Sequence, residues 1–247
     1  MKATKWISAF ILLATLTSCT FKEEIYINDD GSGKFALNAD ASAIMSMIPN
    51  DSLGDKGMKT MDSTFAFRDI FNNKKDSIAK LSKEEQARLK KLENFSMHIN
   101  MNAEQKQLVF GVLSDFKNVS ELQDAMSTMS EIKNIDKSKK AEAAPAVDFG
   151  KNNSQLSYTY NGKKFTRKAT VGKNQVKESM RDSAMAAYKV IYDQSSYVIN
   201  YHFPKKVKKV SNPNALFSED RKTITIEYPF MDYIQDPEKL NFEVTFE

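Results

Sequence analysis

Alternation of apolar and polar residues predicts most of the regular structure in this chain. It occurs at 25–27, 95–101 and 156–160, and in each case a turn signal and a second apolar stretch follow. Successive side chains of a strand point to opposite faces, so each pair of stretches predicts a β-hairpin. The strongest turn signal is Asn161-Gly162. Three further alternating strands are expected near the end of the chain, over residues 197–203, 223–228 and 241–246.

Helical spacing of apolar residues marks four other segments. Asp40 and Ser82 are placed to cap the first two of these helices, and Glu85 completes a capping-box pattern with Ser82. Two more helices are expected over residues 120–132 and 176–191. One-sided strands with a few amphipathic helices predict an α+β fold, with helices packed on one face of an antiparallel sheet built from β-hairpins.

Periodicity fades between residues 134 and 153, where lysines, alanines and Pro145 prevail. This composition is typical of a flexible connector. The connector either separates two subdomains or loops out of a single one, and the sequence leaves both readings open.

The first eighteen residues have the pattern of an export signal. Lys2 and Lys5 precede an apolar run of eleven residues, which is too short to span a bilayer as a helix. Leu16-Thr17-Ser18-Cys19 resembles the lipobox of bacterial lipoproteins. The resemblance implies cleavage between Ser18 and Cys19, a diacylglycerol on the Cys19 sulfur and a fatty acyl group, such as palmitate, on the new amine. An uncleaved membrane anchor is the alternative.

Composition agrees with an exported globular protein. Cys19 is the only cysteine, so lipidation would account for it and no intramolecular disulfide is possible. Residues 19–247 carry nearly balanced charge, because the full chain has 36 basic and 32 acidic residues and two of the lysines lie in the signal. This balance argues against a nucleic-acid partner. We expect a cell-envelope protein held by lipid at Cys19, most simply in the outer membrane.

Catalytic motifs are missing from the sequence. It contains no nucleophile elbow, P-loop, dinucleotide fingerprint or zinc-binding helix motif. His98 and His202 lie on the polar sides of predicted strands and are 104 residues apart in the sequence. Neither has a second histidine or a cysteine close to it in the sequence. We therefore predict no catalytic residue, metal or cofactor. The alternative is an envelope enzyme whose carboxylate or histidine site forms only in the folded chain.

Two charged stretches are candidates for contact with a partner. Lys205, Lys206, Lys208 and Lys209 form the densest basic run, which suits anionic lipid headgroups or a ligand, or else protects the end of a strand from pairing with other chains. Lys22-Glu23-Glu24 resembles a tag that sends some Bacteroidota lipoproteins to the cell surface. A solvated lead-in to the first strand is the simpler interpretation of that tripeptide.

The two ends of the chain are similar to a group of bacterial lipoproteins that includes the mycobacterial LppM type. The resemblance rests on the Asp29–Gly33 turn and on the runs Tyr201–Val207 and Lys222–Ile226. It implies a lipid-anchored α+β body beside a membrane, with lipid binding. The leading hypothesis is a non-enzymatic lipoprotein that binds an envelope protein or an apolar ligand. The aromatic residues of the closing strands are candidates for the lining of an apolar pocket, and plain sheet core is the simpler interpretation of the same residues. An enzyme and a structural spacer are the other two hypotheses.

Overall fold

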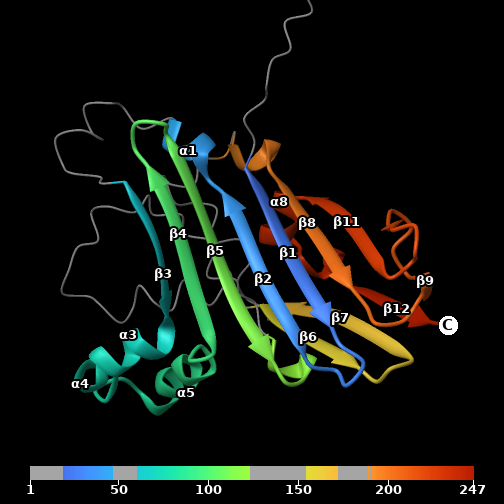
Figure 1. Ribbon diagram of the computed structural model, residues 1–247, viewed down its shortest axis with the longest axis horizontal. Coiled ribbons are helices and arrows are strands. Elements are labelled where there is room, and N and C mark those ends of the chain that lie inside the picture. The colour runs from blue at the N-terminus through green and yellow to red at the C-terminus, as the bar shows by residue number, and fades with distance from the viewer. Residues whose placement is uncertain (1–18, 47–59, 123–153, 172–188, 190) are drawn as a thin grey trace, which may run out of the picture.

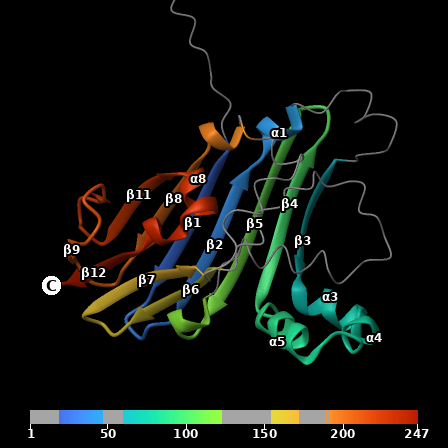
Figure 2. The same cartoon turned by 180° about the vertical axis from the view of Figure 1, so that it is seen from behind.

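The strands form two sheets, one of eight strands and one of four, which lie against each other (Figures 1 and 2). The computed structural model describes residues 19–46, 60–122, 154–171, 189 and 191–247. The large sheet has the order β10-β11-β8-β1-β2-β5-β4-β3 and the small sheet the order β6-β7-β12-β9. The strands are β1 (Thr20–Ile27), β2 (Gly33–Asp40), β3 (Met61–Ala66), β4 (Phe95–Asn102), β5 (Gln107–Phe116), β6 (Ser154–Tyr160), β7 (Lys164–Val171), β8 (Ser196–His202), β9 (Val207–Val210), β10 (Leu216–Phe217), β11 (Thr223–Pro229) and β12 (Phe242–Phe246).

The three predicted hairpins are confirmed. β1 pairs with β2, β4 with β5, and β6 with β7, each antiparallel. Two of the turns contain a glycine with positive φ, Gly31 at 83° and Gly162 at 76°, a backbone conformation that residues with a Cβ rarely adopt. The side chain of Asn161 also accepts hydrogen bonds from the backbone N–H groups of Lys163 and Lys164. Local turn chemistry therefore fixes these hairpins.

The large sheet is mixed, so the prediction of an antiparallel sheet is wrong. β1 and β8 pair in parallel, with Thr20 opposite Ser196 and Tyr26 opposite His202. The two strands are far apart in the sequence, and alternation along each strand says which face is apolar but not which strand lies beside it. The predicted connector at 134–153 falls between them and lies outside the described residues.

The predicted α+β arrangement, with helices packed on one face of the sheet, is also wrong. The small sheet covers β1 and β8 instead, and aromatic rings from both sheets meet between them. Phe165 of β7 contacts Tyr201 of β8, with ring centroids 5.5 Å apart, and Phe242 of β12 lies 5.7 Å from the same tyrosine ring. The closing strands look alike in sequence, yet β8 and β11 belong to one sheet and β12 to the other. The fold is therefore predominantly β.

Helices occupy the margins of the large sheet. The capping box of Ser82 and Glu85 is confirmed at the start of α5, and α3 to α5 lie between the end of β3 and the start of β4 (Figure 1). Helix α8 packs against strand β8, where the ring of Tyr233 stacks on Tyr197 at 4.5 Å. The helices predicted at 120–132 and 176–191 lie almost wholly outside the described residues. Helical segments are α1 (Ser42–Ser46), α3 (Phe67–Asn73), α4 (Lys75–Ile78), α5 (Lys83–Lys91), α8 (Phe230–Gln235) and the 3-10 turns η1 (Val119–Glu121) and η3 (Pro237–Leu240).

The described helices are short. None of them is both long and apolar enough to cross a membrane. The longest, α5, has nine residues.

Candidate functional site

Cys19 lies immediately before the central strand of the large sheet. β1 begins at Thr20, and the Cys19 carbonyl accepts a hydrogen bond from the backbone N–H of Ser196, at 3.2 Å. The Cys19 side chain is buried and belongs to the hydrophobic core cluster. Ser18 lies outside the described residues, so cleavage and lipidation at this position stay predictions. What the fold adds is that nothing separates Cys19 from the folded body.

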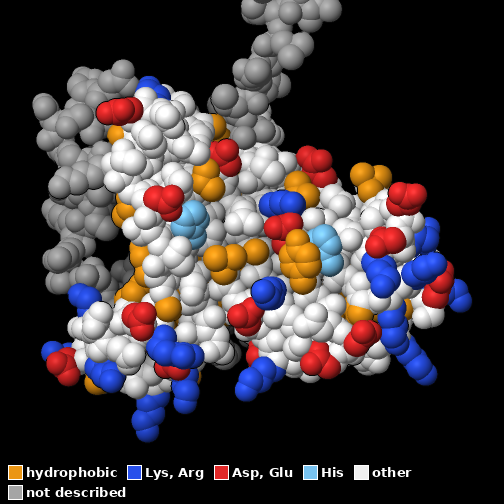
Figure 3. Space-filling model, viewed as in Figure 1, with side chains coloured by type: hydrophobic (Ala, Val, Ile, Leu, Met, Phe, Trp, Pro, Cys, Tyr) orange, Lys and Arg blue, Asp and Glu red, His pale blue; other side chains and the backbone are white. Residues whose placement is uncertain are grey.

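The four lysines predicted as a contact site are all exposed and lie at one end of the molecule. Lys205 and Lys206 follow β8, and Lys208 and Lys209 belong to the edge strand β9. Figure 3 shows one group of Lys and Arg side chains at the end of the molecule that carries β9 and another at the end that carries α3 to α5. Because β8 runs parallel to β1, this end is opposite to Cys19. The eight residues of β1 span about 26 Å, at roughly 3.3 Å per residue.

Folding brings further basic residues beside this run. The Lys205 ammonium donates to the carbonyl of Gly162, at 3.0 Å, which places the β6–β7 turn next to it. The Arg221 guanidinium donates to the carbonyl of Val207 at the start of β9. The resulting group, called here the basic corner, consists of Lys163, Lys164, Lys205, Lys206, Lys208, Lys209, Arg221 and Lys222.

The additional members of the basic corner were not predicted from the sequence. Lys163 and Lys164 directly follow the Asn161-Gly162 turn in the sequence. What the sequence does not indicate is that this turn and the segment after β8 meet in the folded chain.

The two histidines do not form a shared site. His98 lies on β4 and His202 on β8, with β1, β2 and β5 between them. The His98 Nε2 atom is 2.8 Å from the Asp62 carboxylate, but both side chains lie on the open outer face of the large sheet, and both histidines are visible there in Figure 3. The His202 ring stacks on Tyr26 and hydrogen-bonds the Thr223 hydroxyl. Burial lowers the pKa of His202.

Neither histidine is enclosed in a cleft with an acid, as the alternative of a hidden histidine site required. Among the described residues, no three His, Cys, Asp or Glu side chains are placed to share a metal ion. The structure therefore adds no support to a catalytic interpretation of His98 or His202.

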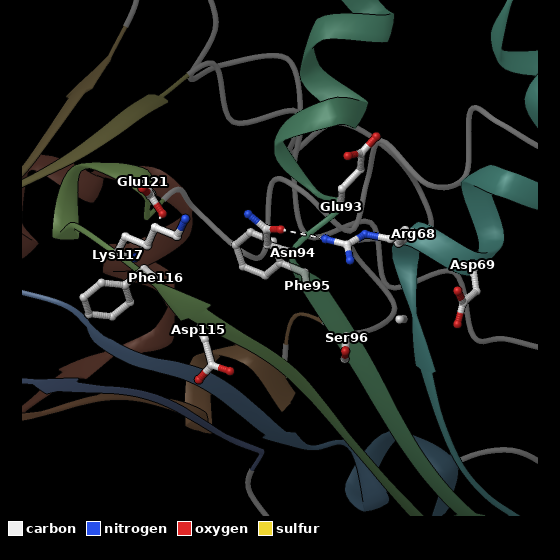
Figure 4. Close-up of a pocket in the computed structure, with 11 residues that line it drawn as sticks. Arg68, Asp69, Glu93, Asn94, Phe95, Ser96, Asp115, Phe116, Lys117 and Glu121 are labelled. Atoms are coloured by element: carbon white, nitrogen blue, oxygen red, sulfur yellow. Dashed lines mark hydrogen bonds between the residues drawn. The ribbon is translucent and has the colours of Figure 1, made fainter.

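A groove of about 570 Å³ opens beside α3, at the start of β4 and the end of β5 (Figure 4). The Arg68 guanidinium reaches Asn94 across it, with 3.2 Å between the Nη2 and Oδ1 atoms. The lining mixes apolar side chains with charges of both signs, so it favours neither a purely apolar ligand nor a ligand of a single charge. Its charged residues are Arg68, Asp69, Glu93, Asp115, Lys117 and Glu121.

The aromatic residues of the closing strands are core, which removes them as the lining of an apolar pocket. Tyr197, Tyr201 and Phe242 are each at most 2% exposed and contact other rings between the sheets. This agrees with the plainer of the two sequence interpretations.

Glu23 is the main residue that the sequence interpretation misplaced. It is not part of a solvated lead-in, because it is 1% exposed on β1 and faces the small sheet. Its carboxylate accepts hydrogen bonds from the hydroxyls of Tyr158, Tyr197 and Tyr201 and from the Arg167 guanidinium, 3.4 Å away. The alternation along β1 does indicate that Glu23 is buried, since Glu23 lies two residues from both Phe21 and Ile25 and so shares their apolar face.

Glu23 and Arg167 join the two sheets through a charge pair. Arg167 of β7 is also fully buried, and it donates a second hydrogen bond to the carbonyl of Leu240, at 3.1 Å. Burial alone would raise the pKa of Glu23, but Arg167 and the three hydroxyls outweigh it and lower that pKa from its usual 4.5. Burial and the Glu23 charge raise the pKa values of Tyr158 and Tyr201 well above 10.0. A carboxylate enclosed by these partners has a structural role.

Stability should consequently fall at both ends of the pH range. A lowered carboxyl pKa stabilises the fold above the ordinary value of 4.5, and this contribution is lost as pH falls through the lowered pKa of Glu23. The raised pKa values of Tyr158 and Tyr201 contribute fully below pH 10.0, and their contribution is lost as pH rises from there through the raised values. Urea unfolding midpoints measured from acid to alkaline pH test both limbs.

Tyr158→Phe provides the specific check on the alkaline limb. It should flatten that limb, because one buried hydroxyl no longer resists ionisation. Tyr26→Phe is the matched control, since the Tyr26 side chain is exposed on the outer face. Equal alkaline slopes in the two variants would contradict the assignment.

Comparison with known proteins finds little similarity. No protein-family model matches the chain, and no curated protein matches it. Among solved structures, the NMR structure of the folded domain of LppM from Mycobacterium tuberculosis is similar at a TM-score of 0.38 and 9% identity, over 93% of this chain and 89% of that one. The likeness is loose.

Proposed function

We propose that this chain is a lipid-anchored protein of the cell envelope, without a catalytic role, that presents its basic corner to an anionic partner. The observation that carries the proposal is the arrangement along β1 and β8. Cys19, in its lipobox context, joins directly to the start of β1, and the basic corner lies beyond the end of the parallel strand β8. The lipid attachment point and the contact surface are thereby kept apart by the length of a strand. The outer membrane is the expected location.

Two further observations favour binding over catalysis. The buried carboxylate of Glu23 is saturated by protein donors, and the histidines lie on an open face. The basic corner, in contrast, exposes side chains of one dominant charge. Charge complementarity is therefore the clearest recognition chemistry on the described surface.

Lipid attachment is tested by Cys19→Ser expressed in a bacterium that processes lipoproteins. The variant should accumulate as the unlipidated precursor, because the serine hydroxyl does not replace the thiol as the acceptor of the diacylglyceryl group. Intact mass and labelling with a radioactive fatty acid give the readout. Thr20→Ser, one residue further along, is the control and should be processed and acylated as the native chain is. Normal acylation of Cys19→Ser would refute the anchor.

A further inference from the structure

An exposed apolar pair accompanies the basic corner. Leu216 and Phe217 form the edge strand β10, and their side chains are 69% and 40% exposed. The Arg221 guanidinium lies over the Phe217 ring, 4.6 Å from its centroid, while it also bonds the carbonyl of Val207. One side chain thus links the apolar pair to β9. Large apolar side chains that stay exposed beside a concentrated charge indicate a contact surface.

The charge of this surface is positive after its acids are counted. The acidic residues at this end are Glu219 and Asp220 before β11, Glu243 and Glu247 in and after β12, and Asp29 and Asp30 of the β1–β2 turn, which lies beside Tyr160; these six stand against the eight basic residues of the corner. Glu243 is paired with Lys164, and the Asp220 carboxylate accepts bonds from its own turn. Among the described residues, none of the four lysines between 205 and 209 forms an ion pair.

We infer that the basic corner and the Leu216–Phe217 pair dock on the anionic lipid surface of the membrane that holds Cys19. The inference rests on the proposed anchor and names the partner. Lysine ammonium groups attract the phosphate headgroups, and the leucine and phenylalanine side chains enter the boundary between headgroups and acyl chains.

The composition of the corner favours lipid over an acidic protein. Seven of its eight basic residues are lysines. Lysine is depleted at the centres of protein interfaces, where arginine is enriched, because a flexible point charge gives little geometric specificity. A fluid layer of headgroups requires no such specificity. The same flexible lysines are therefore well matched to lipid.

Attachment at two points sets the orientation of the body. The lipid on Cys19 holds one end of β1, and the docking surface lies about 26 Å away, at roughly 3.3 Å per residue of strand. Both contact one membrane only if β1 and β8 lie along its surface. The tether at Cys19 raises the local concentration of the corner to the millimolar range, about what a weak electrostatic contact needs.

A single-tryptophan reporter tests whether the Leu216–Phe217 pair docks on anionic lipid. Trp6 is the only tryptophan and lies in the signal segment, so the mature lipoprotein has none. The mature Phe217→Trp lipoprotein is purified from its membranes and reconstituted into vesicles of phosphatidylcholine alone, or of phosphatidylcholine and phosphatidylglycerol in equal parts. Its emission should shift to the blue, and brominated lipids should quench it, in the anionic vesicles only. Leu216→Trp is the second reporter if Phe217→Trp melts early.

Matched controls separate docking from general effects. Leu113→Trp places the reporter on the outer sheet face at a side chain that is also 40% exposed, and its emission should be the same in both vesicles. Reversal of Lys205, Lys206, Lys208 and Lys209 to glutamate should lower the ratio of docked to undocked protein at least about tenfold. The same reversal at four exposed lysines of the helical end, Lys75, Lys80, Lys83 and Lys90, should leave it unchanged.

A lipidated Phe217→Trp protein that sediments with both vesicles, but whose tryptophan emission is the same in each, overturns the docking and leaves the anchor intact. If both sets of lysine reversals lower the ratio of docked to undocked protein equally, the effect of charge is nonspecific. If the corner binds only to an added acidic protein, its partner is a protein. Either result overturns the lipid assignment. If the protein purified from the cells carries no lipid and stays in the supernatant with both kinds of vesicle, the anchor and the docking are overturned together.

Discussion

Glu23→Gln is expected to lower the free energy of unfolding by about 3–5 kcal/mol, the range for removing one partner of a buried ion pair. The amide fills the same space, but it leaves the Arg167 guanidinium as a buried charge without a counter-charge between the two sheets. It also weakens the hydrogen bonds that three tyrosine hydroxyls donate to the carboxylate. Urea unfolding followed by circular dichroism gives the difference.

Glu24→Gln is the neighbouring control. Glu24 lies on the outer face and pairs with Lys22 at 2.8 Å, so its loss should cost less than about 1 kcal/mol. The double variant Glu23→Gln/Arg167→Met should be more stable than the sum of the single losses predicts, by about 0.5–3 kcal/mol, because no unpaired charge remains. A loss at Glu23→Gln as small as that at Glu24→Gln would mean that the buried pair does not hold the sheets together.

Gly33→Ala is expected to cost about 3 kcal/mol or more, at the upper end of the range for overpacking. A Cβ at Gly33 would lie 1.8 Å from the backbone oxygen of Tyr26 and 2.6 Å from the Phe116 ring. The backbone oxygen belongs to β1, which is hydrogen-bonded on both sides, so it cannot move without disturbing two strand pairs. Thermal and urea unfolding of the variant measure the loss.

Gly162→Ala is the comparison for this substitution. Its φ of 76° disfavours alanine, but the nearest atom to an added Cβ is the end of the flexible Lys205 side chain, at 3.6 Å. We expect a loss of about 1 kcal/mol from the backbone conformation alone. If Gly33→Ala proved as mild as Gly162→Ala, the packing at the β1–β2 turn would be looser than described.

The stability and the proposed function depend on different parts of the molecule. The Glu23 cluster is enclosed between the sheets, whereas the basic corner and β10 lie at one end and contribute little to the core. Substitutions at the corner should therefore change docking without unfolding the protein. This separation makes the lipid-docking experiment interpretable.

The sequence predicted local elements well because local forces determine them. The Asn161-Gly162 hairpin and the Ser82–Glu85 capping box follow from hydrogen bonds and dihedral preferences within a few residues. The basic run from Lys205 to Lys209 was also predicted, because its members are adjacent in the sequence. Glu23 was missed because its charge outweighed its position, two residues from apolar neighbours on each side.

What the sequence by itself determined is most of the described strands, their apolar faces and three hairpins, while the lipobox at Cys19 stays a prediction. Only the tertiary structure decided that β1 lies parallel to β8, that a second sheet rather than helices covers them, and that Glu23 meets Arg167, 144 positions away. The physical reason is that alternation specifies which face of a strand must be buried, while the partner that buries it is chosen by the complementarity of whole surfaces. The same long-range choice assembled the basic corner from three separate segments and set it opposite Cys19.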